Sequence, residues 1–188
     1  MTKFLTLKHW QLLGLLMGVP IACQFIAIGT VISTNNPLTM VYLFSIMMIF
    51  VVGIFFGWLY TLGTNLHKKL PITANMNLKR FKIFLLIPIV YMLLIPIFMG
   101  DMFSNTSLGE QLNLSILALI IPLHLFSMLC IFYCLYFNAK TLKTVELQKA
   151  VTFNDFAGCF FLIWFLPIGI WIIQPRINKL FSDNIDYN

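Results

Sequence analysis

The sequence predicts an all-α integral membrane protein: a compact bundle of four transmembrane helices plus a fifth apolar segment. Three observations support this fold class. The 188-residue chain is 60% hydrophobic and only 10% charged, whereas about 25% of the residues of a soluble domain are charged. Its mean hydropathy is +0.92, and a single soluble core of this size could not bury so many apolar side chains. Finally, Lys and Arg gather in the gaps between apolar runs.

Five apolar runs divide the chain, at about residues 10–32, 38–62, 83–99, 112–137 and 156–173. A membrane-spanning helix needs about 20 residues. The first, second and fourth runs exceed this length, and the third and fifth lie near the lower limit. Because the runs are apolar on every face, they indicate helices rather than the alternating strands of a membrane barrel. The gaps are too short for a soluble domain, so residues 1–188 are expected to form a single transmembrane domain.

The first run is as long as a complete span, which argues against a cleaved signal peptide. It places Gly14, Gly18 and Ala22 four residues apart, so that small side chains share one helical face. The same run contains Gln24, an isolated polar residue at membrane depth. We expect Gln24 to form a hydrogen bond, either with His124 or with a neighbouring subunit.

The second run repeats the small-residue pattern with Gly53 and Gly57. Lipid provides no hydrophobic drive for helices to associate, so close packing and hydrogen bonds must hold them together. We therefore expect these residues to pack the first two helices against each other within the chain. A contact between copies of the chain is the alternative, because the same spacing suits both.

Prolines mark the third and fourth runs. The third contains Pro88 and Pro96 and is expected to bend, because proline removes a helical hydrogen bond. In the fourth, Pro122 precedes His124, an ionisable group at a depth where such groups are functional candidates. We expect His124 to be a structural histidine with a hydrogen-bonding partner. The alternatives are that it binds a proton or a ligand, or that it ligates a haem. The sequence singles out no second axial ligand, so no cofactor is predicted.

The fifth run contains Pro167 and Gly169 in its middle. Its length permits a crossing of a thin bilayer, and we expect a kinked crossing. A re-entrant segment is the alternative, because helix-breaking residues suit a dip whose backbone is buried in protein. Trp164 and Trp171 are candidate anchors at the membrane interface. Arg176 follows Pro175, where the apolar helix is expected to end, and is expected to reach lipid phosphates.

The charges of the gaps predict the orientation. The gap of residues 66–82 is strongly basic and is therefore predicted to be cytoplasmic. The gap of residues 100–111 contains Asp101 and Glu110 but no Lys or Arg, and is predicted to lie outside. Lysines return in residues 138–155, which are predicted to be cytoplasmic. Four crossings of an inner or plasma membrane then leave the N-terminus in the cytoplasm.

Several functional classes lack support. The sequence contains no HExxH motif, phosphate-binding loop or paired carboxylates, so no catalytic or metal site is predicted. The four cysteines all lie in apolar runs and are expected to pack as small hydrophobic residues. The basic residues flank the apolar runs instead of forming a stripe, so nucleic-acid binding is not expected.

These features indicate a non-enzymatic accessory or regulatory subunit that acts through helix–helix packing. The alternative is a homo-oligomeric channel or pore-type effector, which would need several copies because one bundle this small and uncharged has no aqueous pathway. A third class is a membrane enzyme or haem protein that uses His124. The expected partners are the lipid bilayer and either further copies of the chain or a larger membrane complex.

Overall fold

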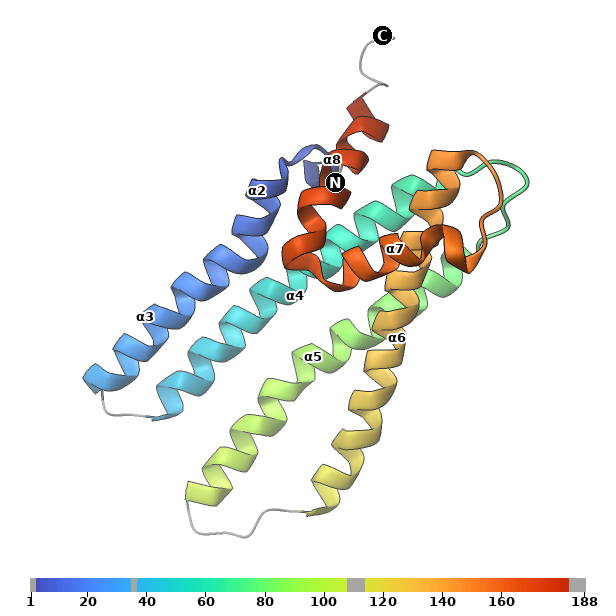
Figure 1. Cartoon of the computed structure of the whole chain (residues 1–188). Coiled ribbons are helices and arrows are strands. Elements are labelled where there is room, and N and C mark those ends of the chain that lie inside the picture. Colours follow the sequence, from blue (N-terminus) through green and yellow to red (C-terminus); the bar gives the residue numbers. More distant parts are fainter. Residues whose placement is uncertain (1–2, 35–36, 108–113, 183–188) are drawn as a thin grey trace.

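The computed structural model describes residues 3–34, 37–107 and 114–182, with side chains over 3–33, 43–96 and 118–181 (Figure 1). All regular secondary structure in these ranges is helical. The elements are α1 (Lys3–Thr6), α2 (His9–Leu13), the π-helical turn η1 (Gly14–Gly18), α3 (Val19–Thr34), α4 (Pro37–His67), α5 (Leu78–Ser107), α6 (Leu114–Leu147), α7 (Phe153–Trp164) and α8 (Leu166–Ser182).

Three segments in the described part of the chain are long and apolar enough to cross a membrane. They are His9–Ser33, which joins α2, η1 and α3, then Leu43–His67 in α4 and Ala118–Leu147 in α6. The remaining predicted span, the third run at residues 83–99, lies in α5 and rests on the sequence alone. α5 is a single helix of 30 residues that continues through Pro88 and Pro96. The side chains of Asp101 and Glu110, which suggested that this gap faces outward, lie outside the described residues.

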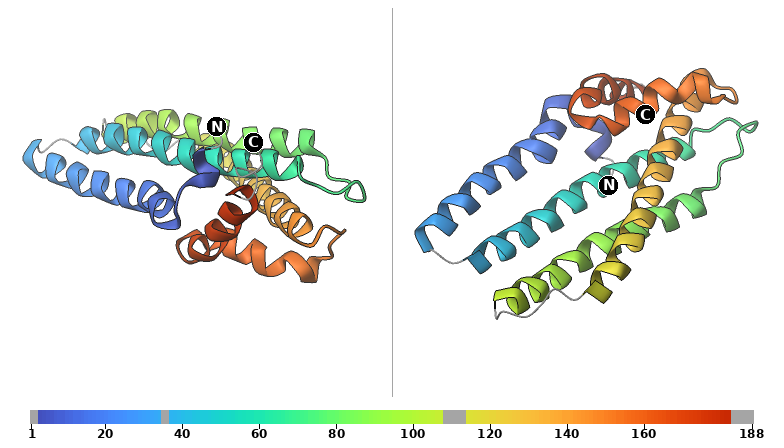
Figure 2. Two further views of the ribbon diagram at one scale, coloured as in Figure 1. Left: turned by 90° about the horizontal axis from the view of Figure 1, so that it is seen from above. Right: turned by 60° about the horizontal axis from the view of Figure 1, so that its bottom comes forward.

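The long helices lie side by side, with α4 between α3 and α5, and with α6 against both α4 and α5 (Figures 1 and 2). The buried core occupies only one end of this bundle. It joins α1 and α2 to the second half of α4, the start of α5, the second half of α6, and α7 and α8. Toward the other end, the described side chains of α3 and of the first half of α6 are mostly exposed, and those of the first half of α4 are exposed or half-buried with the exception of Val52. The molecule therefore has a packed end and an open end.

The fifth apolar run does not form the single kinked helix in which a crossing was expected. α7 has 12 residues, about 18 Å at 1.5 Å per residue, which is too short to span a bilayer. The backbone of Phe165 then leaves the helical region, with φ −87° and ψ 62°. α8 turns back and contacts α1 and α2 at the packed end (Figures 1 and 2). The run is thus a helical hairpin with the geometry of the re-entrant alternative.

Two residues explain this reversal. A Cβ atom built on Gly169 would lie 1.6 Å from the carbonyl oxygen of Leu162, so only glycine allows the two helices to meet so closely. Pro167 occupies the first turn of α8, where a proline is tolerated because its missing N–H has no helical partner. It starts a helix here instead of bending one. Pro175 does not end the helix as the sequence predicted, because α8 continues through it to Ser182.

The connection between α6 and α7 is defined by local polar contacts. Gln148 follows α6 with a φ of 49°, a left-handed conformation that ends the helix. At the start of α7, the Asp155 carboxylate accepts hydrogen bonds from the backbone N–H and the hydroxyl of Thr152, both at 2.8 Å. These two bonds lower the pKa of Asp155 below its usual range, and the bond from the backbone N–H has the larger effect. The connection therefore positions α7 across the packed end.

Candidate functional site

Gln174 of α8 is the centre of a buried hydrogen-bond network at the packed end. Its side chain is fully buried, and its Oε1 accepts a bond from the indole N–H of Trp58 at 3.2 Å. Its amide group donates to the carbonyls of Phe4 and Leu7, at 2.9 and 3.0 Å. Asn178, one turn later, also donates to the Leu7 carbonyl, at 3.0 Å. The network satisfies carbonyls that the end of a helix leaves unpaired and attaches α8 to α1 and α4.

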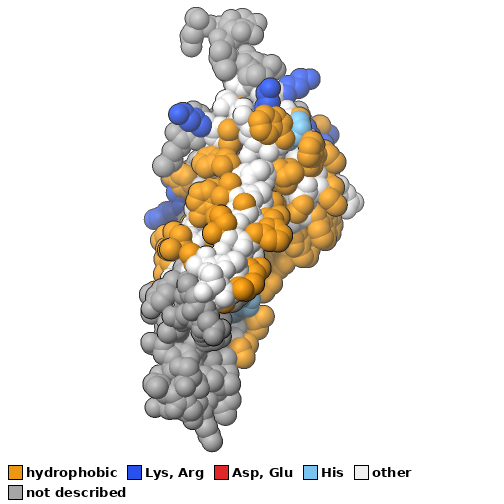
Figure 3. All heavy atoms as spheres, turned by 90° about the vertical axis from the view of Figure 1, so that its left-hand side faces the viewer, with side chains coloured by type: hydrophobic (Ala, Val, Ile, Leu, Met, Phe, Trp, Pro, Cys, Tyr) orange, Lys and Arg blue, Asp and Glu red, His pale blue; other side chains and the backbone are white. Residues whose placement is uncertain are grey.

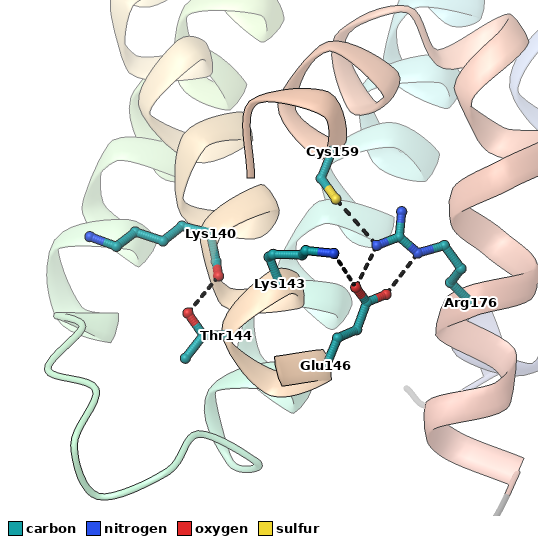
Figure 4. Close-up of polar contacts among 6 residues, drawn as sticks. All are labelled: Lys140, Lys143, Thr144, Glu146, Cys159 and Arg176. Atoms are coloured by element: carbon teal, nitrogen blue, oxygen red, sulfur yellow. Dashed lines mark hydrogen bonds and ion pairs between the residues drawn. The ribbon is translucent and has the colours of Figure 1, made fainter. Parts of the chain in front are cut away.

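Arg176 forms the second polar cluster, with Glu146 of α6 (Figure 4). Its Nε donates to one carboxylate oxygen at 2.7 Å, and its Nη2 donates to the other at 2.5 Å. The same Nη2 lies 3.4 Å from the Sγ of Cys159 in α7, and Lys143 approaches the carboxylate at 3.6 Å. The hydrogen bond with Glu146 raises the pKa of Arg176. The predicted phosphate-binding arginine is therefore paired within the chain, where it joins three helices.

His124 has the hydrogen-bonding partner that a structural histidine requires. Its Nδ1 lies 3.0 Å from the hydroxyl of Tyr91 in α5, and Tyr91 is buried. The predicted bond to Gln24 is not formed, because the histidine faces α5. One turn after His124, the Ser127 hydroxyl is buried without a hydrogen-bonding partner among the described residues. The contact between Tyr91 and His124 links α5 and α6 toward the open end.

The small-residue faces do not pack the first two helices together as expected. No atom lies within 4 Å of a Cβ built on Gly14, Gly18 or Gly53, and Ala22 is exposed. At Gly57 the nearest atom belongs to the Phe4 ring, at 3.6 Å. Larger side chains carry the buried core of these helices instead, namely Leu12, Leu16, Val52 and Phe56.

Helices also approach closely at Gly63, which the sequence reasoning missed. A Cβ at Gly63 would lie 2.6 Å from the Phe81 ring of α5 and 3.0 Å from the Asn138 amide oxygen of α6. The Phe81 ring is in turn stacked on Phe137, with centroids 4.4 Å apart. Gly63 lies ten residues after Gly53 and outside its four-residue register, so spacing alone could not identify it.

Both tryptophans of the hairpin lie on its outer surface. Trp164 is 46% exposed and Trp171 is 50% exposed. The Trp164 ring packs edge-on against Phe132 of α6 at 4.9 Å, while Trp171 lies 4.5 Å from the His9 ring of α2. Half-exposed rings with one packed side suit the interface position that the sequence predicts.

A groove with a volume of about 540 Å³ lies between α4 and α5, and Phe4 closes one side. Its lining is almost entirely apolar. Among the described residues that line it, Lys82 is the only charged one, and its Nζ lies 5.8 Å from the centre of the Tyr60 ring. The lining residues are Phe4, Val52, Gly53, Phe56, Gly57, Tyr60, Thr61, Lys82, Leu85, Leu86 and Ile89.

Within the described ranges, no three His, Cys, Asp or Glu side chains come together as a metal site would require. Cys130, Cys134 and Cys159 are buried free thiols, and Cys23 is exposed. Comparisons of the chain with protein-family models, with curated proteins and with solved structures found no match.

Proposed function

We propose that this chain is a non-enzymatic accessory or regulatory subunit of a membrane complex. In this proposal α2–α3, α4, α5 and α6 cross an inner or plasma membrane, and the hairpin of α7 and α8 stays on the cytoplasmic side with the N-terminus. The clustering of lysines at residues 66–82 and 138–155 supports this orientation. The contacts of α8 with α1 and α2 support placing the hairpin at the same end.

The main support for this proposal is the exposed small-residue face of the first span, His9–Ser33. α3 lies at the edge of the bundle (Figure 1), where α4 is its main neighbour. Gly14 and Gly18 of η1 and Ala22 of α3 are exposed, and no other part of the described chain occupies the space beside the two glycines. In lipid, such a face stabilises a contact by letting another backbone approach closely. A helix of a different membrane protein is the partner that we propose.

The test is to purify the full-length chain in mild detergent from its own membrane and measure its native mass. We expect a second polypeptide at fixed stoichiometry, which is lost in Gly18→Leu. Cys23→Leu is the matched control, because this small exposed residue lies about 140° around the same helix from Gly18. Recovery of a monomer alone, or equal loss of the partner in both variants, would argue against an accessory subunit.

A homo-oligomeric channel is the second candidate, because the same open face is equally accessible to another copy of the chain. It predicts a native mass that is a multiple of the chain mass. It also predicts ion flux from liposomes that contain only this protein, reduced by Gly18→Leu and retained by Cys23→Leu.

A further inference from the structure

The groove between α4 and α5 is built from one face of each helix. On α4 its residues recur every three or four positions over 52–61, and on α5 Lys82, Leu85, Leu86 and Ile89 recur in the same way. Such spacing places side chains on one side of a helix. The two faces therefore form a continuous trough along the helices, with Lys82 near the start of α5.

Glycine gives the groove its depth. No atom lies within 4 Å of a Cβ built on Gly53, and a Cβ on Gly57 would meet only the Phe4 ring at 3.6 Å. A large side chain at Gly53 would therefore occupy space that is now part of the groove. The Thr61 hydroxyl, which could make the wall polar, instead donates to the Gly57 carbonyl at 2.7 Å.

Lys82 supplies the charge. Neither ion pair in the described part of the chain includes Lys82, since both are formed with Glu146. Lys82 lies in the second turn of α5, and α5 begins directly after the basic connection at residues 68–77. In the view of Figure 3, Lys and Arg side chains lie toward this packed end, above a band of hydrophobic side chains. The groove thus runs from a cationic end into apolar surroundings.

The length and the wall of the groove favour a hydrocarbon chain as its occupant. Residues 82–89 extend about 10 Å along α5 at 1.5 Å per residue. The lining beyond Lys82 is almost entirely apolar. An extended hydrocarbon chain is thinner than a helix and requires no hydrogen-bonding partners from the wall.

We propose that this groove binds one acyl chain of an anionic glycerophospholipid from the surrounding bilayer, with the lipid phosphate at Lys82. Basic residues at the cytoplasmic ends of membrane helices bind such headgroups. Because lipid tails are as apolar as the groove, shape and charge, rather than hydrophobicity, must provide the selectivity. The proposal depends on insertion in a membrane and is independent of the protein partner proposed above.

Native mass spectrometry of the purified, delipidated full chain, titrated with phosphatidylglycerol or phosphatidylcholine, tests the proposal. We expect one high-affinity phosphatidylglycerol per chain, bound about fivefold more tightly than phosphatidylcholine, the selectivity that one lysine near the surface provides. Lys82→Gln should remove this preference. Gly53→Leu should weaken the binding of both lipids, because the leucine side chain fills the groove.

Two matched controls define the site. Lys79→Gln removes an exposed positive charge from the same helix outside the groove, and Gly29→Leu adds a large side chain in open space on α3. Both should bind lipid as the wild type does. An equal effect of Lys79→Gln, or wild-type binding by Gly53→Leu, would overturn the proposal.

A further control separates the lipid from a protein ligand. If Gly53→Leu is not recovered as folded protein, Leu86→Trp narrows the groove from the α5 side, where Leu86 is exposed. Loss of a co-purifying polypeptide in these groove variants, with lipid binding unchanged, would assign the groove to a protein partner and overturn the lipid proposal. Loss of the partner in Gly18→Leu alone would leave the lipid site unaffected.

Discussion

Arg176 connects three helices through one guanidinium group. It belongs to α8, binds the Glu146 carboxylate of α6 with two hydrogen bonds, and contacts the Cys159 thiol of α7. The side chains of Arg176 and Glu146 are only 30% and 18% exposed. Two parallel bonds between charged groups give a defined geometry as well as energy. At the scale of single residues, this pair holds the returning helix against the bundle.

We expect Glu146→Gln to lower the free energy of unfolding by about 2 kcal/mol, because it weakens two charge-assisted hydrogen bonds to a partly buried arginine. Denaturant titration of the protein in mixed micelles measures this change. Lys143→Gln removes the weaker ion pair with the same carboxylate and should cost less than about 0.5 kcal/mol. Additive effects of Glu146→Gln and Arg176→Gln in the double variant would show that the pair is not coupled.

The hairpin of α7 and α8 depends on a contact between two backbones. Gly169 meets the Leu162 carbonyl where a side chain cannot fit, and the N–H of Gly169 donates to the Phe165 carbonyl at 2.8 Å. This turn closes both short helices against each other. At the scale of the element, glycine therefore allows the run to turn at Phe165 instead of continuing as one helix.

Gly169→Ala should destabilise the protein by about 3 kcal/mol, the upper part of the range for overpacking a tight contact. Gly158→Ala in α7 is the matched control, because no atom lies within 4 Å of its Cβ position. It should be neutral or stabilise the helix by up to about 1 kcal/mol. Denaturant titration of both variants compares them directly. Wild-type stability of Gly169→Ala would contradict the observed turn.

At the scale of the whole molecule, the described chain has a polar, densely packed end and an apolar, open end. The packed end collects α1, α2, α7, α8 and the connection between α4 and α5. In this connection, the Lys69 ammonium lies 4.4 Å from the centre of the Phe181 ring and donates a hydrogen bond to the Leu180 carbonyl of α8. This contact places the last described turn of α8 beside the basic connection. The open end presents apolar helix faces that a bilayer or a partner would cover.

This arrangement predicts that residues 68 and 179 lie on the same side of the membrane. In a background without the natural cysteines, Lys68→Cys and Lys179→Cys should react with an impermeant maleimide from the same side. Ser33→Cys, at the far end of α3, should react from the opposite side. Labelling of Lys179→Cys from the side of Ser33→Cys would show that the fifth run crosses, as the sequence alone had suggested.

Composition and periodicity determined the class of this protein. Runs of apolar residues longer than a bilayer is thick form helices whatever their tertiary contacts, because lipid leaves backbone amides no other partners. Apart from the turn at Phe165, helices therefore form the described part of every predicted run, and three segments meet the requirements of a span. His124 could likewise be expected to have a partner, since an ionisable group at this depth needs one.

Only the tertiary structure decided how polar and small residues are used. The helix was expected to end at Pro175, and Arg176 was expected to reach lipid phosphates. Gln174 and Arg176 instead have partners on segments far away in the sequence, at Phe4, Trp58 and Glu146. Glycine spacing predicted a packed face, whereas a glycine is required only where a backbone or ring comes too close for a Cβ, as at Gly169. Such proximity depends on which helices become neighbours, and local periodicity carries no information about that choice.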